Sequence, residues 1–334
     1  MLDRAKLAAL PHPQLSRTDA MERGIAASVA YVGSDAALEA IARDPYWPKW
    51  DTPWWHMLLL HEVGETRQIP ARTADAMAAG LDRLLHLFAI HPGDAPEGYD
   101  SHRDVSCHCA LGCMVPLLAE CGVDVDRALP WVRPWFVRYQ MADGGLTCDD
   151  SAYLVTDECP SSMVGTVPSI EAMLLARDPS AEERGFLERA ARFLIDRALV
   201  RGSATVHNAA EREAATGWRL PCFPRFYHYD VLRGLAALVR WAEANGEALP
   251  QRAVADVVGD LIARFPDGVV RVERHAHAGM TTIILGQRGS RVPASSFPLL
   301  EAAGALGEPS PALTHQWSET RRGLLRLADA GRLV

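Results

Sequence analysis

The sequence predicts a single all-α domain built as two concentric rings of helices, an α/α toroid with about five to six helix pairs. Three observations support this prediction. Apolar residues recur at positions i, i+3, i+4 and i+7 over most of the chain, and few stretches alternate with period two. The helices fall into pairs, each a more apolar helix followed by a more charged one. Glycine follows most of the charged helices.

A first helix is expected over residues 18–43. The apolar members of the following pairs are expected at residues 53–63, 105–121, 161–176, 225–244 and 294–306. Their charged partners are expected at residues 71–89, 126–141, 181–200, 250–265 and 311–330. Glycine 144, 202, 268 and 331 each stand where a helix end favours a left-handed residue. An apolar helix buried on all sides beside an amphipathic one, repeated around a closed circuit, gives an inner and an outer ring.

The 334 residues are expected to form one domain, residues 1–334, in which residues 1–50 are an N-terminal helical extension that closes the ring. Residues 92–99 and 203–216 lack helical periodicity, so we expect them to be loops over the mouth of the ring. If the inner helices are parallel, their N-termini open on one rim. The functional site is expected on that rim.

Composition narrows the class of protein. The chain is 49% hydrophobic with a formal net charge of −8, and it has no run of Lys or Arg, so nucleic acid is not an expected partner. Apolar runs such as residues 57–60 are too short to cross a bilayer, and no signal peptide is evident, which favours a cytoplasmic protein with no transmembrane segment. Four of seven cysteines lie within residues 107–121, which indicates reduced thiols. The oligomeric state stays open.

The first candidate site is the entry to the second apolar helix, where His102, Asp104, Cys107, His108 and Cys109 lie close in sequence. Thiols and imidazoles in a reduced protein are typical ligands of a soft metal ion such as zinc. Consecutive positions on a helix point in different directions, so a complete site needs ligands from elsewhere. The alternative is that small buried thiols simply pack an inner helix.

The second candidate follows an outer helix, where Cys148, Asp149 and Asp150 come after two glycines. Adjacent carboxylates and a thiol could bind a metal, or one carboxyl could stay protonated through mutual repulsion. A neutral acid at the mouth of an apolar cavity can protonate an alkene or an epoxide. The alternative is that both carboxylates cap a turn or face water.

The third candidate is the start of the fourth apolar helix, where His228 and Asp230 are flanked by aromatic residues. A histidine in this position would titrate near neutral pH or bind a metal, and the aromatic rings would form an apolar wall. The alternative is a histidine that packs among aromatic rings, with Asp230 placed at the helix N-terminus by its favourable interaction with the helix dipole.

The chain resembles members of the terpenoid cyclase and protein prenyltransferase superfamily over about residues 50–330. Residues 226–235 are similar to the Tyr-His helix start of prenyltransferase β subunits, which implies that His228 is a zinc ligand. Asp104 and Cys107 resemble the other two ligands of that zinc, with one extra residue between them. Residues 147–152 resemble the Asp-x-Asp-Asp-Thr-Ala acid motif of class II cyclases, which implies that Asp149 is the proton donor.

The sequence therefore predicts an enzyme that binds an apolar or isoprenoid-like small molecule in the mouth of the toroid and catalyses cyclisation or transfer. The alternative is a non-catalytic toroid that binds a peptide or a lipid. The expected catalytic carboxylates are Asp149, Asp150 and Asp230. The expected ligands of a zinc ion are His108, Cys109, Cys148 and His228, with Cys107 and Asp104 as substitutes.

Overall fold

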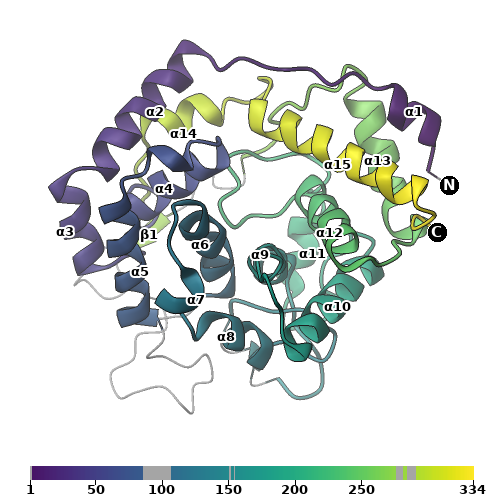
Figure 1. The fold of residues 1–334 in the computed structure, drawn as a ribbon, viewed down its shortest axis with the longest axis horizontal. Coiled ribbons are helices and arrows are strands. Elements are labelled where there is room, and N and C mark those ends of the chain that lie inside the picture. The colour runs from purple at the N-terminus through teal and green to yellow at the C-terminus, as the bar shows by residue number, and fades with distance from the viewer. Residues whose placement is uncertain (1, 86–106, 150–151, 154, 276–280, 284–290) are drawn as a thin grey trace.

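Helices make up nearly all of the regular structure. The computed structural model describes residues 2–85, 107–149, 152–153, 155–275, 281–283 and 291–334 (Figure 1). Within these ranges the chain forms fifteen α-helices, one short 3-10 helix and a single pair of three-residue strands. The predicted all-α class is confirmed.

The expected helix pairs are present, with shifts at their ends. The apolar members are α4 (Pro53–Glu62), α6 (His108–Glu120), α9 (Met163–Met173), α12 (Val231–Asn245) and α14 (Pro298–Ala303). The charged members are α5 (Ala71–Leu85), α8 (Val132–Arg138), α10 (Ala181–Asp196), α13 (Gln251–Arg264) and α15 (Pro311–Asp329). Figure 1 shows α4, α6, α9 and α12 towards the centre of the molecule, with α3, α5, α8, α10 and α13 outside them.

Two predicted helices are broken. The helix expected at residues 18–43 is α2 (Asp19–Val32) and α3 (Asp35–Arg43), which meet at an angle of 65°. Gly33 ends α2, and the hydroxyl of Ser34 accepts a hydrogen bond from the backbone N–H of Ala37 at 3.2 Å, so Ser34 caps a new helix. The helix expected at residues 126–141 is α7 (Val125–Ala128) and α8, with Pro130 between them.

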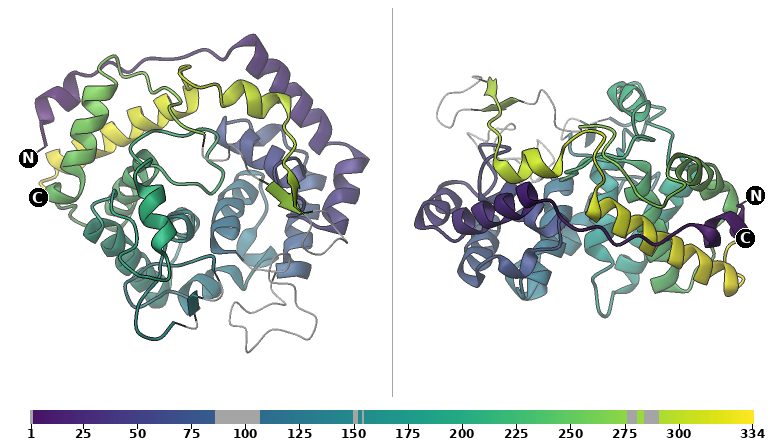
Figure 2. Two further views of the ribbon diagram at one scale, coloured as in Figure 1. Left: turned by 180° about the vertical axis from the view of Figure 1, so that it is seen from behind. Right: turned by 90° about the horizontal axis from the view of Figure 1, so that it is seen from above.

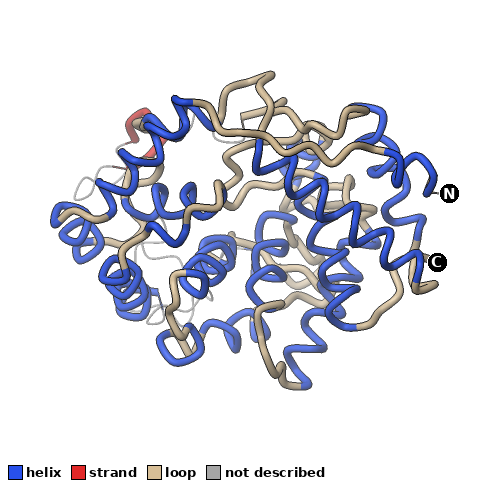
Figure 3. The backbone as a smooth tube through the Cα atoms, turned by 45° about the horizontal axis from the view of Figure 1, so that its top comes forward, coloured by secondary structure: helices blue, strands red, loops and turns tan. Residues whose placement is uncertain are grey.

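The remaining elements are α1 (Arg4–Ala9), the 3-10 helix η1 (Thr66–Gln68), α11 (Ala209–Ala215) and the antiparallel strands β1 (Thr281–Ile283) and β2 (Arg291–Pro293). Figures 2 and 3 show the two strands at one corner of the molecule, apart from the central helices. Part of the predicted loop 203–216 is thus the helix α11, whereas loop 92–99 lies outside the described residues.

The N-terminal segment packs against helices from the C-terminal part of the chain. Helix α2 packs against α14 and α4, and α1 packs against α15. Between α1 and α2, the guanidinium of Arg321 donates hydrogen bonds to the carbonyls of Leu10 and Pro11. The two termini lie close together (Figure 1). No single described helix is long and apolar enough to cross a membrane; α2 and α3 meet that test only when joined across their bend.

Close packing between α6 and α9 fixes the part of the core that carries the candidate site. A Cβ atom at Gly112 in α6 would lie 2.4 Å from the backbone carbonyl carbon of Pro168 in α9, so only glycine permits this approach. Because the two helices cannot move apart without losing buried apolar contacts, their N-terminal ends are held at a fixed distance.

Candidate functional site

Three cysteines from two separate segments meet at the N-terminal end of α6. The Sγ atoms of Cys107, Cys109 and Cys148 all lie within 4.8 Å of one another, and those of Cys107 and Cys109 are 2.8 Å apart. Cys109 is buried, and the other two are partly buried. No disulfide is formed among the described cysteines. The three thiols could hold one metal ion, and we call them the three-thiol site.

Backbone geometry brings Cys107 and Cys109 together. Cys107 is the N-cap residue of α6, with φ −74° and ψ 118°, so its backbone is extended rather than helical. Two residues of one helix at i and i+2 would point in different directions. Because the helix begins only at His108, the Cys107 side chain turns back towards Cys109. Cys107 and Cys109 can therefore both face one metal ion, although they are only two residues apart.

The loop that carries Cys148 is held against α9 and α10. Gly144 has φ +88°, and a Cβ atom there would lie 2.3 Å from the carbonyl oxygen of Arg189 in α10. The N–H of Leu146 donates to Thr166 in α9 at 2.9 Å, and its carbonyl accepts from the N–H of Ser162 at 2.8 Å. These contacts place the next two residues beside the start of α6.

His108 binds the loop that carries Cys148 to the start of α6, and it is not part of the three-thiol site. Its Nδ1–H donates to the carbonyl oxygen of Thr147 at 2.7 Å, and the ring lies near Phe136 and Tyr139. Burial lowers the pKa of His108 to about 4, so the imidazole is neutral at pH 7. Its buried Nε2 atom has no hydrogen-bond partner among the described residues. The structure thus gives His108 a positioning role next to two thiols.

Hydrogen bonding within the three-thiol site favours one thiolate. Hydrogen bonds with the thiols of Cys109 and Cys148 lower the pKa of Cys107 well below its ordinary value. The positive charge of Lys49 acts in the same direction. Burial raises the pKa of Cys109, and the hydrogen bond to Cys107 raises that of Cys148. The Cys148 sulfur also accepts the N–H of Cys109 at 3.3 Å.

Aromatic residues from two segments surround the charge of Lys49 close to the three-thiol site. The Lys49 ammonium lies 5.0 Å from the centre of the Tyr46 ring and 5.3 Å from that of Tyr227. Burial, and then the negative charge of the thiols, raise the pKa of both tyrosines well above its ordinary value. The Tyr46 hydroxyl is buried and has no hydrogen-bond partner among the described residues.

His228 lies against this aromatic group. Its ring is nearly parallel to that of Trp50, with the centres 6.0 Å apart, and its centre is 4.6 Å from that of Tyr227. Among the described residues, the group of potential ligands that meets at the N-terminal end of α6 contains thiols only. The structure therefore does not bring His228 together with Cys109 and Cys148 as a ligand.

The three carboxylates expected to be catalytic have different surroundings. Asp149 is 52% exposed, and its Oδ2 accepts a hydrogen bond from Nε2 of His207 at 2.9 Å. This setting is not the buried, apolar one that keeps a carboxyl protonated at neutral pH. Asp150, like Asp104, lies outside the described residues.

Asp230 is a buried structural residue. Its side chain is fully buried, and it accepts hydrogen bonds from Nε and Nη2 of Arg225 at 2.7 and 2.9 Å. It also accepts the backbone N–H of Arg233 at 2.9 Å, which makes it the N-cap of α12, and that of Cys222 at 3.1 Å. Both oxygens are thus occupied by the chain itself. Asp230 therefore fixes the position of α12, and this structural role replaces the catalytic role expected from the sequence.

The sequence predicts Cys107 only as a substitute ligand and does not point to Tyr46 and Lys49 as part of the site. The Cys-x-Cys spacing was visible in the sequence, but the extended backbone at residue 107 was not. No family model, no curated protein and no solved structure matches this chain.

Proposed function

We propose that this protein is a zinc-dependent transferase with an α/α toroid fold, in which Cys107, Cys109 and Cys148 hold the metal and a fourth coordination position receives a thiol-bearing acceptor. The proposal rests on one observation, the convergence of three sulfur atoms within 4.8 Å. Its link to the terpenoid cyclase and prenyltransferase superfamily rests on the sequence resemblance and on the inner and outer placement of the helices (Figure 1).

The spacing of the sulfur atoms suits zinc. Zn–S bonds of about 2.3 Å at tetrahedral angles require sulfur atoms roughly 3.8 Å apart, which is between the shortest and the longest spacing that the three-thiol site allows. Thiolates are the ligands that zinc prefers, and Cys107 is already the thiol whose deprotonation the site favours.

Three protein ligands leave zinc with an open position, which distinguishes catalytic from structural sites. A zinc ion held by the three cysteines would lower the pKa of the acceptor thiol. In such a transfer the S–H bond of the acceptor would break with its proton passing to bulk water, an S–C bond would form, and the bond from that carbon to the leaving group would break with its electron pair going to the leaving group. Lys49 offsets the negative charge that the thiolates accumulate, and the Tyr46 hydroxyl is available to donate a hydrogen bond to the leaving group.

Two observations favour transfer over acid-initiated cyclisation. The proton donor implied by the resemblance, Asp149, is half exposed and paired with His207. In contrast, the aromatic residues beside the three-thiol site, Tyr46, Trp50 and Tyr227, provide an apolar wall for the group that is transferred. An apolar, isoprenoid-like donor is the substrate class that this wall and the resemblance support together.

Cobalt substitution tests whether the site is catalytic. Protein stripped of metal and loaded with Co²⁺ is expected to show a near-ultraviolet thiolate-to-cobalt absorption band. Added 2-mercaptoethanol should strengthen that band, because its sulfur becomes a fourth ligand. A band that does not respond to added thiol would indicate a closed structural site, which is the non-catalytic alternative. The absence of any thiolate band would refute metal binding at these cysteines.

A further inference from the structure

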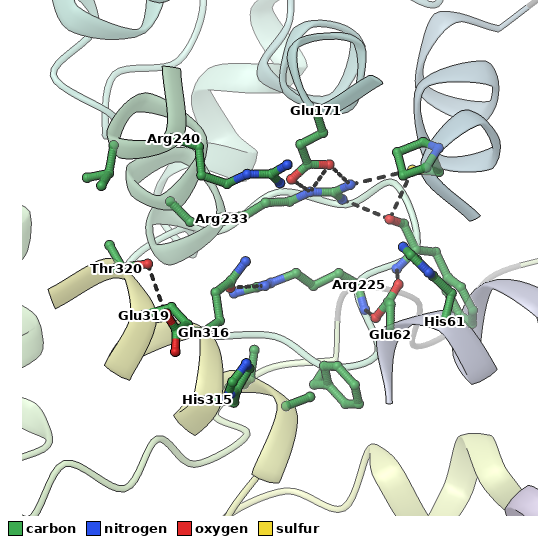
Figure 4. Close-up of a pocket in the computed structure, with 18 of the residues that line it drawn as sticks. His61, Glu62, Glu171, Arg225, Arg233, Arg240, His315, Gln316, Glu319 and Thr320 are labelled. Atoms are coloured by element: carbon green, nitrogen blue, oxygen red, sulfur yellow. Dashed lines mark hydrogen bonds and ion pairs between the residues drawn. The ribbon is translucent and has the colours of Figure 1, made fainter. Parts of the chain in front are cut away.

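A cavity of about 520 Å³ lies among α4, α6, α9, α12 and α15, lined on one side by the segment that precedes α12. We propose that this cavity binds an amphipathic organic anion, a carboxylate or phosphate on a short apolar body, with Arg240 as the group that recognises the anion. Figure 4 shows Arg240 on one wall of the cavity and Glu62 on the opposite wall.

Most charged groups around the cavity already have partners within the chain. Arg233 donates to both oxygens of Glu171, at 2.6 Å for the shortest contact, and to the carbonyls of Phe226 and His228. Arg225 pairs with Asp230, and Arg326 pairs with Glu243 at 2.6 Å. These arginines have few donors left for a ligand, so they shape the cavity without adding net charge.

The two acids that remain on the lining are also engaged. Glu319 pairs with Arg322 at 2.7 Å, outside the cavity. Glu62 accepts the backbone N–H groups of Arg225 and Phe226. Burial raises the pKa of Glu62, and the charges of Arg233 and Arg225 act in the opposite direction.

Arg240 is the exception among the cations. Arg240 is exposed to solvent, its charge acts on the carboxylate of Glu171, and it makes no ion pair within 4 Å to any described residue. Its guanidinium points towards Glu171 (Figure 4), whose charge Arg233 already balances. Arg233, Glu171 and Arg240 together carry a net charge of +1. Free guanidinium donors match the planar geometry of a carboxylate or the oxygens of a phosphate.

The rest of the lining suits an apolar body. Apolar side chains contributed by α4, α12, α15 and the segment before α12 surround the cavity, among them Leu58, Phe223, Val239, Ala312 and Leu313. The volume is within the range of small-molecule sites. A molecule with one anionic group and an apolar chain of several carbons fills such a space, whereas a cation would meet the unpaired guanidinium.

The cavity and the three-thiol site adjoin the same segment, and none of the three thiols lines the cavity. Phe226 lines the cavity, and the next residue, Tyr227, lies in the aromatic group beside the thiols. Binding of the anion therefore does not need a metal. This inference and the proposed transferase function can fail separately.

The test is calorimetric titration of octanoate, octyl phosphate and octylamine into the full chain. The variant is Arg240→Gln, and the matched control is Arg252→Gln, an exposed arginine of α13 outside the cavity. Octanoate or octyl phosphate should bind the wild type, and Arg240→Gln should weaken that binding roughly tenfold, since a charge-assisted hydrogen bond is lost. Arg252→Gln should bind as the wild type does.

A second variant tests the position of the apolar body. Ala312→Trp fills part of the lining without changing charge, so it should weaken octanoate binding as well. Equal affinity of the wild type and Arg240→Gln, tighter binding of octylamine than of both anions, or no binding of either anion at millimolar concentration would overturn the inference. Anion binding that disappears when the protein is treated with a chelator would also overturn it, because the ligand would then be at the three-thiol site.

Discussion

Replacing Asp230 with Asn tests whether this carboxylate is structural. The change keeps the size of the side chain and an N-cap acceptor, but it leaves the nearly buried guanidinium of Arg225 without its charge partner. The side-chain amide of the new Asn also places its N–H donors opposite the Arg225 guanidinium and backbone N–H groups, which are themselves donors. Removing one partner of a buried ion pair costs about 3–5 kcal/mol, a large share of the roughly 5–15 kcal/mol that stabilises an ordinary protein.

The measurement is the free energy of unfolding in urea, followed by tryptophan fluorescence, between pH 3 and pH 8. Burial alone would raise the pKa of Asp230, but the charge and hydrogen bonds of Arg225 outweigh it and lower the pKa below the ordinary 3.8. Because the folded-state pKa is the lower one, the contribution is complete above pH 3.8 and is lost as the pH falls through the folded-state pKa. The difference between wild type and variant should therefore be constant near neutral pH and shrink in acid.

The matched control is Asp149→Asn, which makes the same chemical change at a carboxylate that is 52% exposed. Its hydrogen bond with His207 is exposed to solvent, so the change should cost at most about 1 kcal/mol. A loss below 1 kcal/mol in Asp230→Asn, or an equal loss in both variants, would refute the structural role. The double variant Arg225→Met with Asp230→Asn should recover part of the loss, because no unpaired charge then stays buried.

Two further predictions concern packing and thiol accessibility. Gly112→Ala should destabilise the protein by about 1–3 kcal/mol in the same assay, because the new Cβ would lie 2.4 Å from the backbone of α9. Gly259→Ala, inside α13, should instead stabilise the protein by about 0.5–1 kcal/mol, because the added Cβ meets no other part of the chain within 4 Å. If Gly259→Ala were the more destabilising change, the packing described would be contradicted. Burial raises the pKa of Cys113 and Cys222 to about 12, so neither thiol should react with iodoacetamide at pH 8 until urea unfolds the chain; rapid labelling of the native protein would show that they are not buried.

Helical periodicity predicted the fold class and most of the helices, because burial of one apolar face imposes the same 3.6-residue repeat that the sequence shows. Periodicity cannot show where a helix breaks when capping groups interrupt an otherwise continuous pattern. Ser34 caps α3 inside the predicted helix 18–43, and Asp230 caps α12, which begins six residues after its predicted start. In both cases a local hydrogen bond to a backbone N–H decides the boundary.

The site could be predicted only in part. The sequence names Cys109 and Cys148 together as candidate metal ligands, and their Sγ atoms lie within 4.8 Å of each other. The position of Cys107 depends on an extended N-cap, and the orientation of His108 depends on the carbonyl of Thr147, which is 39 residues away in the chain. Tertiary contacts of this kind leave no periodic signal in the sequence. The charged lining of the cavity is likewise assembled from distant helices.

The metal content of the purified protein tests the central claim most directly. Elemental analysis of protein prepared without chelator should find about one zinc per chain, and Cys109→Ser and Cys148→Ser should lose most of it. The matched control is Cys121→Ser, at the opposite end of α6, which should keep the metal. Metal-free wild-type protein, or equal metal content in all four proteins, would contradict a zinc centre built from Cys107, Cys109 and Cys148.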